Sequence, residues 1–118
     1  MGITENSRRM TPSENGVMQA FWNAKKPMTS RQIVEAVQAA GQATWEPRSV
    51  FVLLNKLMKK DLIRHVGNVH SGKSVARRFE PTMTKAEYLA LVVMDELSEK
   101  ELPEFLESFS KKENPIAS

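Results

Sequence analysis

The residues from Glu46 to Lys60 place cations and amides on one face of an expected helix. At 100° per residue, four apolar side chains fall on the side that would be buried: Val50, Leu54, Leu57 and Met58. Six side chains fall on the opposite side: Arg48, Ser49, Val52, Asn55, Lys56 and Lys59. A solvated helix face normally mixes both signs of charge, whereas this one has no acid. Such a face is typical of a helix that binds a structured anion such as DNA.

Two interpretations of Val52, in the middle of this polar face, stay open. Its methyl groups can contact a thymine methyl in a major groove, or the side chain packs on a neighbouring helix. Pro47 suits the first turn of a helix, where its missing N–H is not needed. We therefore expect a helix over residues 47–59.

A second stretch has the spacing of a phosphate-binding loop. Residues 67–74 match the G-x-x-x-x-G-K-[ST] pattern letter for letter. That loop works only between a buried strand and a long helix. Here residues 75–79 are β-prone, residues 62–66 include Arg64 and His65, and no apolar strand ending in Asp follows. Nucleotide binding is therefore disfavoured, and the glycines are more simply turn residues.

Other sites for catalysis or metal binding are not indicated. His65 and His70 are the only histidines, and with no cysteine they make a poor metal site and a poor catalytic pair. No nucleophile–base pair stands out, and the acids near the end suit a solvated helix face. We expect no enzyme activity, no cofactor and no metal.

Composition and charge fit one soluble globular domain with a small appendage. The 118 residues are 41% hydrophobic and contain no run near the ~20 apolar residues of a membrane span. The first ten residues lack the apolar stretch of a signal peptide, and the absence of cysteine suits a reducing compartment, so we expect a cytoplasmic protein. Through Glu80 the chain carries 13 Lys and Arg against 6 Asp and Glu, and from Pro81 onward 4 against 8. A basic front suits an anionic partner, and the acidic tail suits a different role.

Two helices are expected before residue 46. After a flexible lead-in over residues 1–10, Thr11 with Glu14 forms a capping box, with Pro12 at the first helical position. A second helix is expected to start at Thr29 or Ser30 and to end near Gly41, with Gln32 completing a weaker capping box and Thr29 better explained as a cap than as a phosphate contact. With the helix at 47–59 they form a helix-turn-helix arrangement, in which the N-terminus of the preceding helix also faces the duplex. Ser30 and Arg31 are therefore candidate phosphate contacts.

A β-hairpin is expected next, in the position of the wing of a winged helix. Residues 62–66 and 75–79 are short β-prone runs on either side of a segment, 67–74, rich in Gly, Asn and Ser. Lys73 near the tip and Arg78 on the open face are candidate phosphate contacts. Arg77 shares the face of Phe79 and ranks below them.

Two amphipathic helices are expected after the hairpin, the first opened by Thr84 with Glu87 and the second by Ser98 with Glu101. Pro103 lies awkwardly for a start at Ser98, so the regular helix is expected to begin later or to bend there. Their apolar faces would stay exposed on a monomer, and burial against a second copy is favoured over folding back on the same chain. The candidate dimerisation residues are Tyr88, Leu89, Val92, Val93, Leu97, Leu102, Phe105, Leu106 and Phe109.

In the order and spacing of these motifs the chain resembles the penicillinase-repressor family, the winged-helix repressors of β-lactamase, methicillin-resistance and copper-export operons. The segments that carry the resemblance are residues 10–14 with Val17, Met18 and Trp22, residues 47–54 with Leu57, Lys60, Leu62 and Ile63, and residues 87–89. The resemblance implies a dimeric repressor on a palindromic operator. It also implies that Arg48, Ser49, Phe51 and Val52 occupy the groove-reading positions.

The chain departs from the family's pattern at several points. Val52 stands where members often have Thr, so the operator sequence does not carry over. The segment 67–74 makes the wing longer than usual. The tail is shorter than in the antibiotic-responsive members, where a signal from a membrane sensor leads to cleavage between the domains, and no matching cleavage segment is found. The cysteine motif of the copper-responsive branch is absent.

The predicted architecture is mainly α with a small β-hairpin. A winged helix-turn-helix domain over residues 11–81 is followed by dimerisation helices over residues 82–118. The favoured function is a homodimeric repressor that binds double-stranded operator DNA, with no membrane association. The alternative is a winged-helix protein-interaction module that docks a partner on the apolar tail and binds little DNA.

Overall fold

The computed structural model describes residues 9–41 and 43–117, with side chains described except at 71 and 111–117. The lead-in expected over residues 1–10 falls mostly on residues 1–8, which lie outside the described residues. The chain divides into two compact units between Lys85 and Ala86, whereas the expected division lay between residues 81 and 82. Each unit is described by itself.

The first two helices begin at the capping boxes predicted from the sequence. Helix α2 spans Pro12–Ala24, and the Thr11 hydroxyl accepts from the Glu14 N–H while the Glu14 carboxylate accepts from the Thr11 N–H. Helix α3 spans Ser30–Ala39 and is capped in the same way by Thr29 and Gln32. It ends before Gly41, whose φ of 71° lies in the left-handed region that glycine adopts without strain.

The third helical segment has two parts. Pro47–Ser49 form a 3₁₀ turn, η1, and the regular helix α4 spans Val50–Lys59. The expected helix over 47–59 is therefore correct in extent, but its first turn is 3₁₀. On α4, Val50, Leu53, Leu54 and Leu57 are buried. The sequence pattern missed Leu53 in this set.

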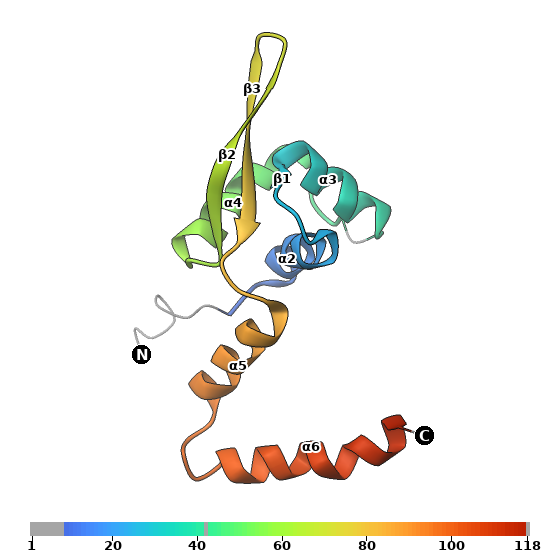
Figure 1. Ribbon diagram of the computed structural model, residues 1–118, viewed down its shortest axis with the longest axis vertical. Coiled ribbons are helices and arrows are strands. Elements are labelled where there is room, and N and C mark those ends of the chain that lie inside the picture. Colours follow the sequence, from blue (N-terminus) through green and yellow to red (C-terminus); the bar gives the residue numbers. More distant parts are fainter. Residues whose placement is uncertain (1–8, 42, 118) are drawn as a thin grey trace. The chain divides into compact units, whose positions relative to one another are not determined.

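The wing is a long antiparallel hairpin of β2, Ile63–Ser71, and β3, Ser74–Pro81, which extends well beyond the helices of this unit (Figure 1). A two-residue strand, β1, Met28–Thr29, pairs with β3 through Met28 opposite Phe79 and Thr29 opposite Arg78, so the sheet order is β1-β3-β2. The predicted winged helix-turn-helix fold is confirmed. Strand β1 was not predicted, because two residues are too short to show an alternating pattern.

The expected turn over residues 67–74 is corrected by the hairpin's register. Pairing continues from Asn68 opposite Arg77 to Ser71 opposite Ser74, so only Gly72 and Lys73 form the turn. Gly72 has φ 61°, as the first central residue of a type II′ turn requires. A register shift between His65 and Gly67 accommodates one extra residue. Because a strand and not a helix follows Lys73, this segment is no phosphate-binding loop.

The core of the first unit lies where α2, α3 and α4 meet the base of the hairpin. Its least exposed large side chains are Met18, Phe21, Ile33, Leu57 and Leu62. At the edge of this core, the indole Nε1 of Trp22 donates a hydrogen bond to the Met83 carbonyl at 3.0 Å. Burial of these apolar side chains fixes the orientation of α4, and hence of its exposed face.

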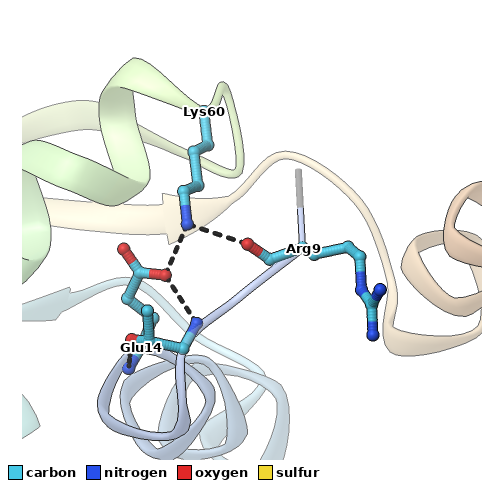
Figure 2. Close-up of polar contacts among 4 residues, drawn as sticks. Arg9, Glu14 and Lys60 are labelled. Carbon is cyan, nitrogen blue, oxygen red and sulfur yellow. Dashed lines mark hydrogen bonds and ion pairs between the residues drawn. The ribbon is translucent and has the colours of Figure 1, made fainter. Parts of the chain in front are cut away.

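A buried ion pair joins the start of α2 to the end of α4 (Figure 2). Glu14 is only 1% exposed, and its Oε1 accepts from Lys60 Nζ at 2.6 Å and from the Thr11 N–H at 2.8 Å. Lys60 Nζ also donates to the Arg9 carbonyl at 2.8 Å. The other Glu14 carboxylate oxygen is buried with no hydrogen-bond partner among the described residues. The ammonium of Lys60 is therefore the main compensation for burying this carboxylate.

The second unit contains helix α5, which begins at the unit boundary and spans Lys85–Glu96, and helix α6, Leu102–Ala117. The Ser98 N–H donates to the Glu101 side chain, and α6 then begins at Leu102. The regular helix thus starts later than Ser98, as Pro103 predicted. Among the described residues, no helix is long and apolar enough to cross a membrane.

We expect Lys60→Met to lower the free energy of unfolding by about 3–5 kcal/mol, because it leaves the Glu14 carboxylate buried without its counter-charge. Glu14→Gln should cost less, since its amide oxygen can still accept from the Thr11 N–H. Urea unfolding followed by circular dichroism measures both values. Lys59→Met, at the neighbouring exposed lysine, is the matched control and should stay within about 0.5 kcal/mol of the parent protein. A Lys60→Met protein as stable as this control would contradict the role of the ion pair.

Candidate nucleic-acid interface

The exposed face of α4 carries the side chains that the sequence pattern assigned to it. Five residues of the helix are exposed: Phe51, Val52, Asn55, Lys56 and Lys59. Val52 is 55% exposed, so no helix of the first unit covers it. Phe51 is 57% exposed and lies beside this face, although the residue pattern alone did not select it. The helix thus buries one side and presents cationic, amide and apolar groups on the other.

Arg48 lies in the turn before α4 and forms an ion pair with Glu46, which is not part of the exposed face of α4. Its Nε donates to Glu46 Oε1 at 3.1 Å, with both side chains largely exposed. On α3, Arg31 forms a similarly exposed pair with Glu35 at 3.9 Å. Exposed pairs of this kind contribute about 0–1 kcal/mol, so an incoming phosphate or base can replace the carboxylate at little cost.

The structure brings the start of α3 and the start of α4 together. A hollow of about 420 Å³ lies between them, lined by Ser30, Arg31, Val34, Glu35, Gln38, Pro47, Arg48, Val50 and Phe51. Thr29 caps α3 at this end, as expected, which leaves Ser30 and Arg31 as the candidate phosphate contacts. Two of the predicted cations, Arg31 and Arg48, therefore border one surface.

The cations of the wing lie at its tip and on both of its faces. Lys73 lies in the turn and is exposed. Arg78 is half-buried on the face opposite Phe79, where a Cβ added to Gly67 would lie 3.4 Å from its Nη2. Arg77 lies on the Phe79 face, which is turned toward α4. Arg64 is engaged by Glu80 through Nε and Nη2, at 2.8 and 2.6 Å.

The two histidines are separate in the structure. His65 Nε2 lies 2.9 Å from Asn68 Oδ1, and its ring lies 5.9 Å from that of Phe79. Within the described part of the chain, no group of three or more His, Asp or Glu side chains could hold a metal ion.

The predicted dimerisation residues differ in exposure. Tyr88 is buried within the single chain, whereas Leu89, Leu106 and Phe109 are exposed. The remaining members are half-buried: Val92, Val93, Leu97, Leu102 and Phe105. Met94, which the sequence pattern did not select, is 68% exposed. On α6 the Phe105 and Phe109 rings pack edge to face, with centroids 4.8 Å apart.

Comparisons with known proteins agree with this architecture. The family model for the penicillinase repressor matches residues 10–117. The transcriptional regulator BlaI of Mycobacterium tuberculosis, from strains CDC 1551 / Oshkosh and ATCC 25618 / H37Rv, is 28% identical to this chain over 93 residues. The match covers 79% of this chain and 62% of the relative, so the chain spans less than two thirds of that protein's length. Because the family model covers both the winged helix and the two helices that follow it, this chain belongs to the penicillinase repressor family.

Proposed function

We propose that this protein is a homodimeric transcriptional repressor that binds a palindromic DNA operator, with α4 in the major groove and the β2–β3 wing beside it. The observation that carries the proposal is the exposed face of α4, which has three polar or cationic residues and no acid: Asn55, Lys56 and Lys59. Helix-turn-helix proteins place this helix in the groove and contact bases mainly through its N-terminal residues. Membership of a repressor family supports the same function.

Each proposed contact has a distinct role. Arg48 and Lys56 bind phosphate or guanine, Ser49 and Asn55 make polar contacts, and Phe51 and Val52 offer apolar surface, Val52 to a thymine methyl. Phosphate contacts come from the start of α3, through Ser30 and Arg31, and from Lys59 of α4. On the wing, Lys73 at the tip is proposed to contact the backbone.

The dimer is proposed from the apolar surface of the second unit. Eight large apolar side chains of the described residues are exposed, and four of them belong to α5 and α6: Leu89, Met94, Leu106 and Phe109. Two helices that expose this much apolar surface are best covered by the same helices of a second copy. A two-fold dimer then presents two α4 helices to half-sites about 10 bp apart, or a multiple of one helical turn.

The test of DNA binding is fluorescence anisotropy with a labelled mixed-sequence duplex, titrated with salt. Engagement of several phosphates predicts a log–log slope of several units, because each contributes about −0.9. Selection of binding sites from a random pool should then give a palindrome. If no duplex binds even at low salt, the repressor function is excluded, and a protein-interaction module that docks a partner on α5 and α6 becomes the favoured function.

We expect Arg48→Ala and Lys56→Ala each to weaken binding to the selected operator by about 1–3 kcal/mol if the residue reads a base, and less if it contacts only phosphate. The measurement is the dissociation constant by anisotropy at fixed salt. Lys100→Ala, which removes the same charge from the segment between α5 and α6, serves as the control and should leave the affinity within twofold of the parent. Unchanged affinity in both α4-region variants would exclude this face as the binding surface.

We expect Leu106→Glu to dissociate the dimer, because burial of such a side chain contributes about 1.5–3 kcal/mol per copy and a two-fold interface uses it twice. Sedimentation equilibrium measures the dimer dissociation constant, and circular dichroism checks that the helices are kept. Glu107→Gln, at the adjacent exposed position, should not change the association. A parent protein that is monomeric at micromolar concentration, or a Leu106→Glu protein that dimerises as tightly as the parent, would contradict the proposed interface.

A further inference from the structure

A hollow of about 280 Å³ separates the wing from α4. It is lined by Ser30 of α3, by Phe51, Leu54, Asn55 and Met58 of α4, and by Val75, Ala76, Arg77 and Phe79 of β3. Its walls therefore come from the helix proposed to enter the major groove and from the strand that begins after the wing turn. None of the described residues that line it is acidic.

Arg77 is the one cation of this lining and is held on an aromatic platform. Its guanidinium carbon lies 5.6 Å from the centroid of the Phe79 ring, within the range of a cation–π contact. Phe79 is only 3% exposed, and the His65 ring lies at 5.9 Å from it, so the platform itself is fixed by the core. A side chain that rests on a fixed ring loses less conformational freedom on binding than one that extends into solvent.

The polar atoms around Arg77 complete an environment for an anion. Ser30 is the first residue of α3, where the helix dipole is positive, and Asn55 offers a side-chain amide from α4. Among the described residues no acid forms an ion pair with Arg77, in contrast to Arg31, Arg48 and Arg64. Phe51 and Val75, both more than half exposed, add apolar surface of the kind that packs on the carbons of a deoxyribose.

We propose that this hollow seats the sugar–phosphate backbone of one DNA strand at the edge of the groove occupied by α4, and that Arg77 is its phosphate anchor. The inference deepens the proposed function and rests on it, since it presumes that α4 enters the major groove. The inner face of the wing then fixes the position of the duplex against α4, whereas sequence is read by α4 itself, because phosphate contacts carry no sequence information.

Arg78, the next residue of β3, is the natural comparison for Arg77. Successive strand residues point to opposite faces, so Arg78 points away from the hollow. Its Nη2 lies near Gly67, and its Nε is buried with no hydrogen-bond partner among the described residues. The pattern of the sequence favoured Arg78 over Arg77 as a backbone contact, and this inference reverses that order.

The experiment compares Arg77→Gln with Arg78→Gln by anisotropy, on the selected operator and on a mixed-sequence duplex, across a salt series. Arg77→Gln should reduce the log–log salt slope by about 0.9 per protomer and weaken binding to both duplexes by the same factor. Arg77→Lys should keep the slope because it keeps the charge. Arg78→Gln should change the slope by less than half as much, and thermal unfolding confirms that all three variants fold.

The outcomes separate this inference from the proposed function. A parent protein that binds with a slope of several units, together with an unchanged slope in folded Arg77→Gln, overturns the inference and leaves the repressor function standing. A slope that falls in Arg78→Gln but not in Arg77→Gln overturns it in favour of the opposite face of the wing. A parent protein that binds no duplex overturns both.

Discussion

The winged domain depends on one buried carboxylate and the lysine that neutralises it. Glu14 closes the capping box of α2, and the same oxygen that accepts from Thr11 also accepts from Lys60, the residue that follows α4. One side chain therefore caps the start of α2 and binds the residue that follows α4. Because a buried charge without a partner is costly, the two helix ends are held together whatever the exposed face of α4 carries. The exposed residues of α4 are therefore not needed to hold these two helix ends together.

The cations of the first unit differ in the acidic or aromatic groups that their side chains contact. Lys60 is largely buried and paired with Glu14, and Arg64 is engaged by Glu80, so both contribute to the structure. Arg31 and Arg48 have only exposed pairs, which an incoming anion can replace. Lys56, Lys59, Lys73 and Arg77 have no acidic partner among the described residues, and Arg77 differs from the other three in resting on a ring. The charge free to bind an anionic ligand is therefore smaller than the residue count through Glu80 implies.

Local features of the fold could be predicted from the sequence because their physics is local. Both capping boxes, the late start of α6 and the exposed face of α4 depend on residues three or four positions apart. The pairing of Glu14 with Lys60 joins positions 46 apart, and β1 exists only because β3 lies beside it, so neither leaves a local pattern. The length of the hairpin was underestimated because Gly, Asn and Ser in residues 67–74 are typical of turns, whereas cross-strand pairing extends the strands through most of them.

The ranking of Arg77 and Arg78 shows where alternation along a strand stops being informative. The pattern correctly put Arg77 on the face of Phe79 and Arg78 on the other face. It then treated residues on the same face as the buried Phe79 as buried too, and so ranked Arg77 below Arg78.

In a hairpin that extends beyond its core, one strand face is buried at its base and open further out: Phe79 is 3% exposed, whereas Val75 on the same face is 55% exposed. Arg77 lies between them, where the core ends and the hollow beside α4 begins, which is why it rests on Phe79 while its charge stays accessible. The distance along the strand from the core, and not the strand face alone, decides which wing residues can meet a ligand.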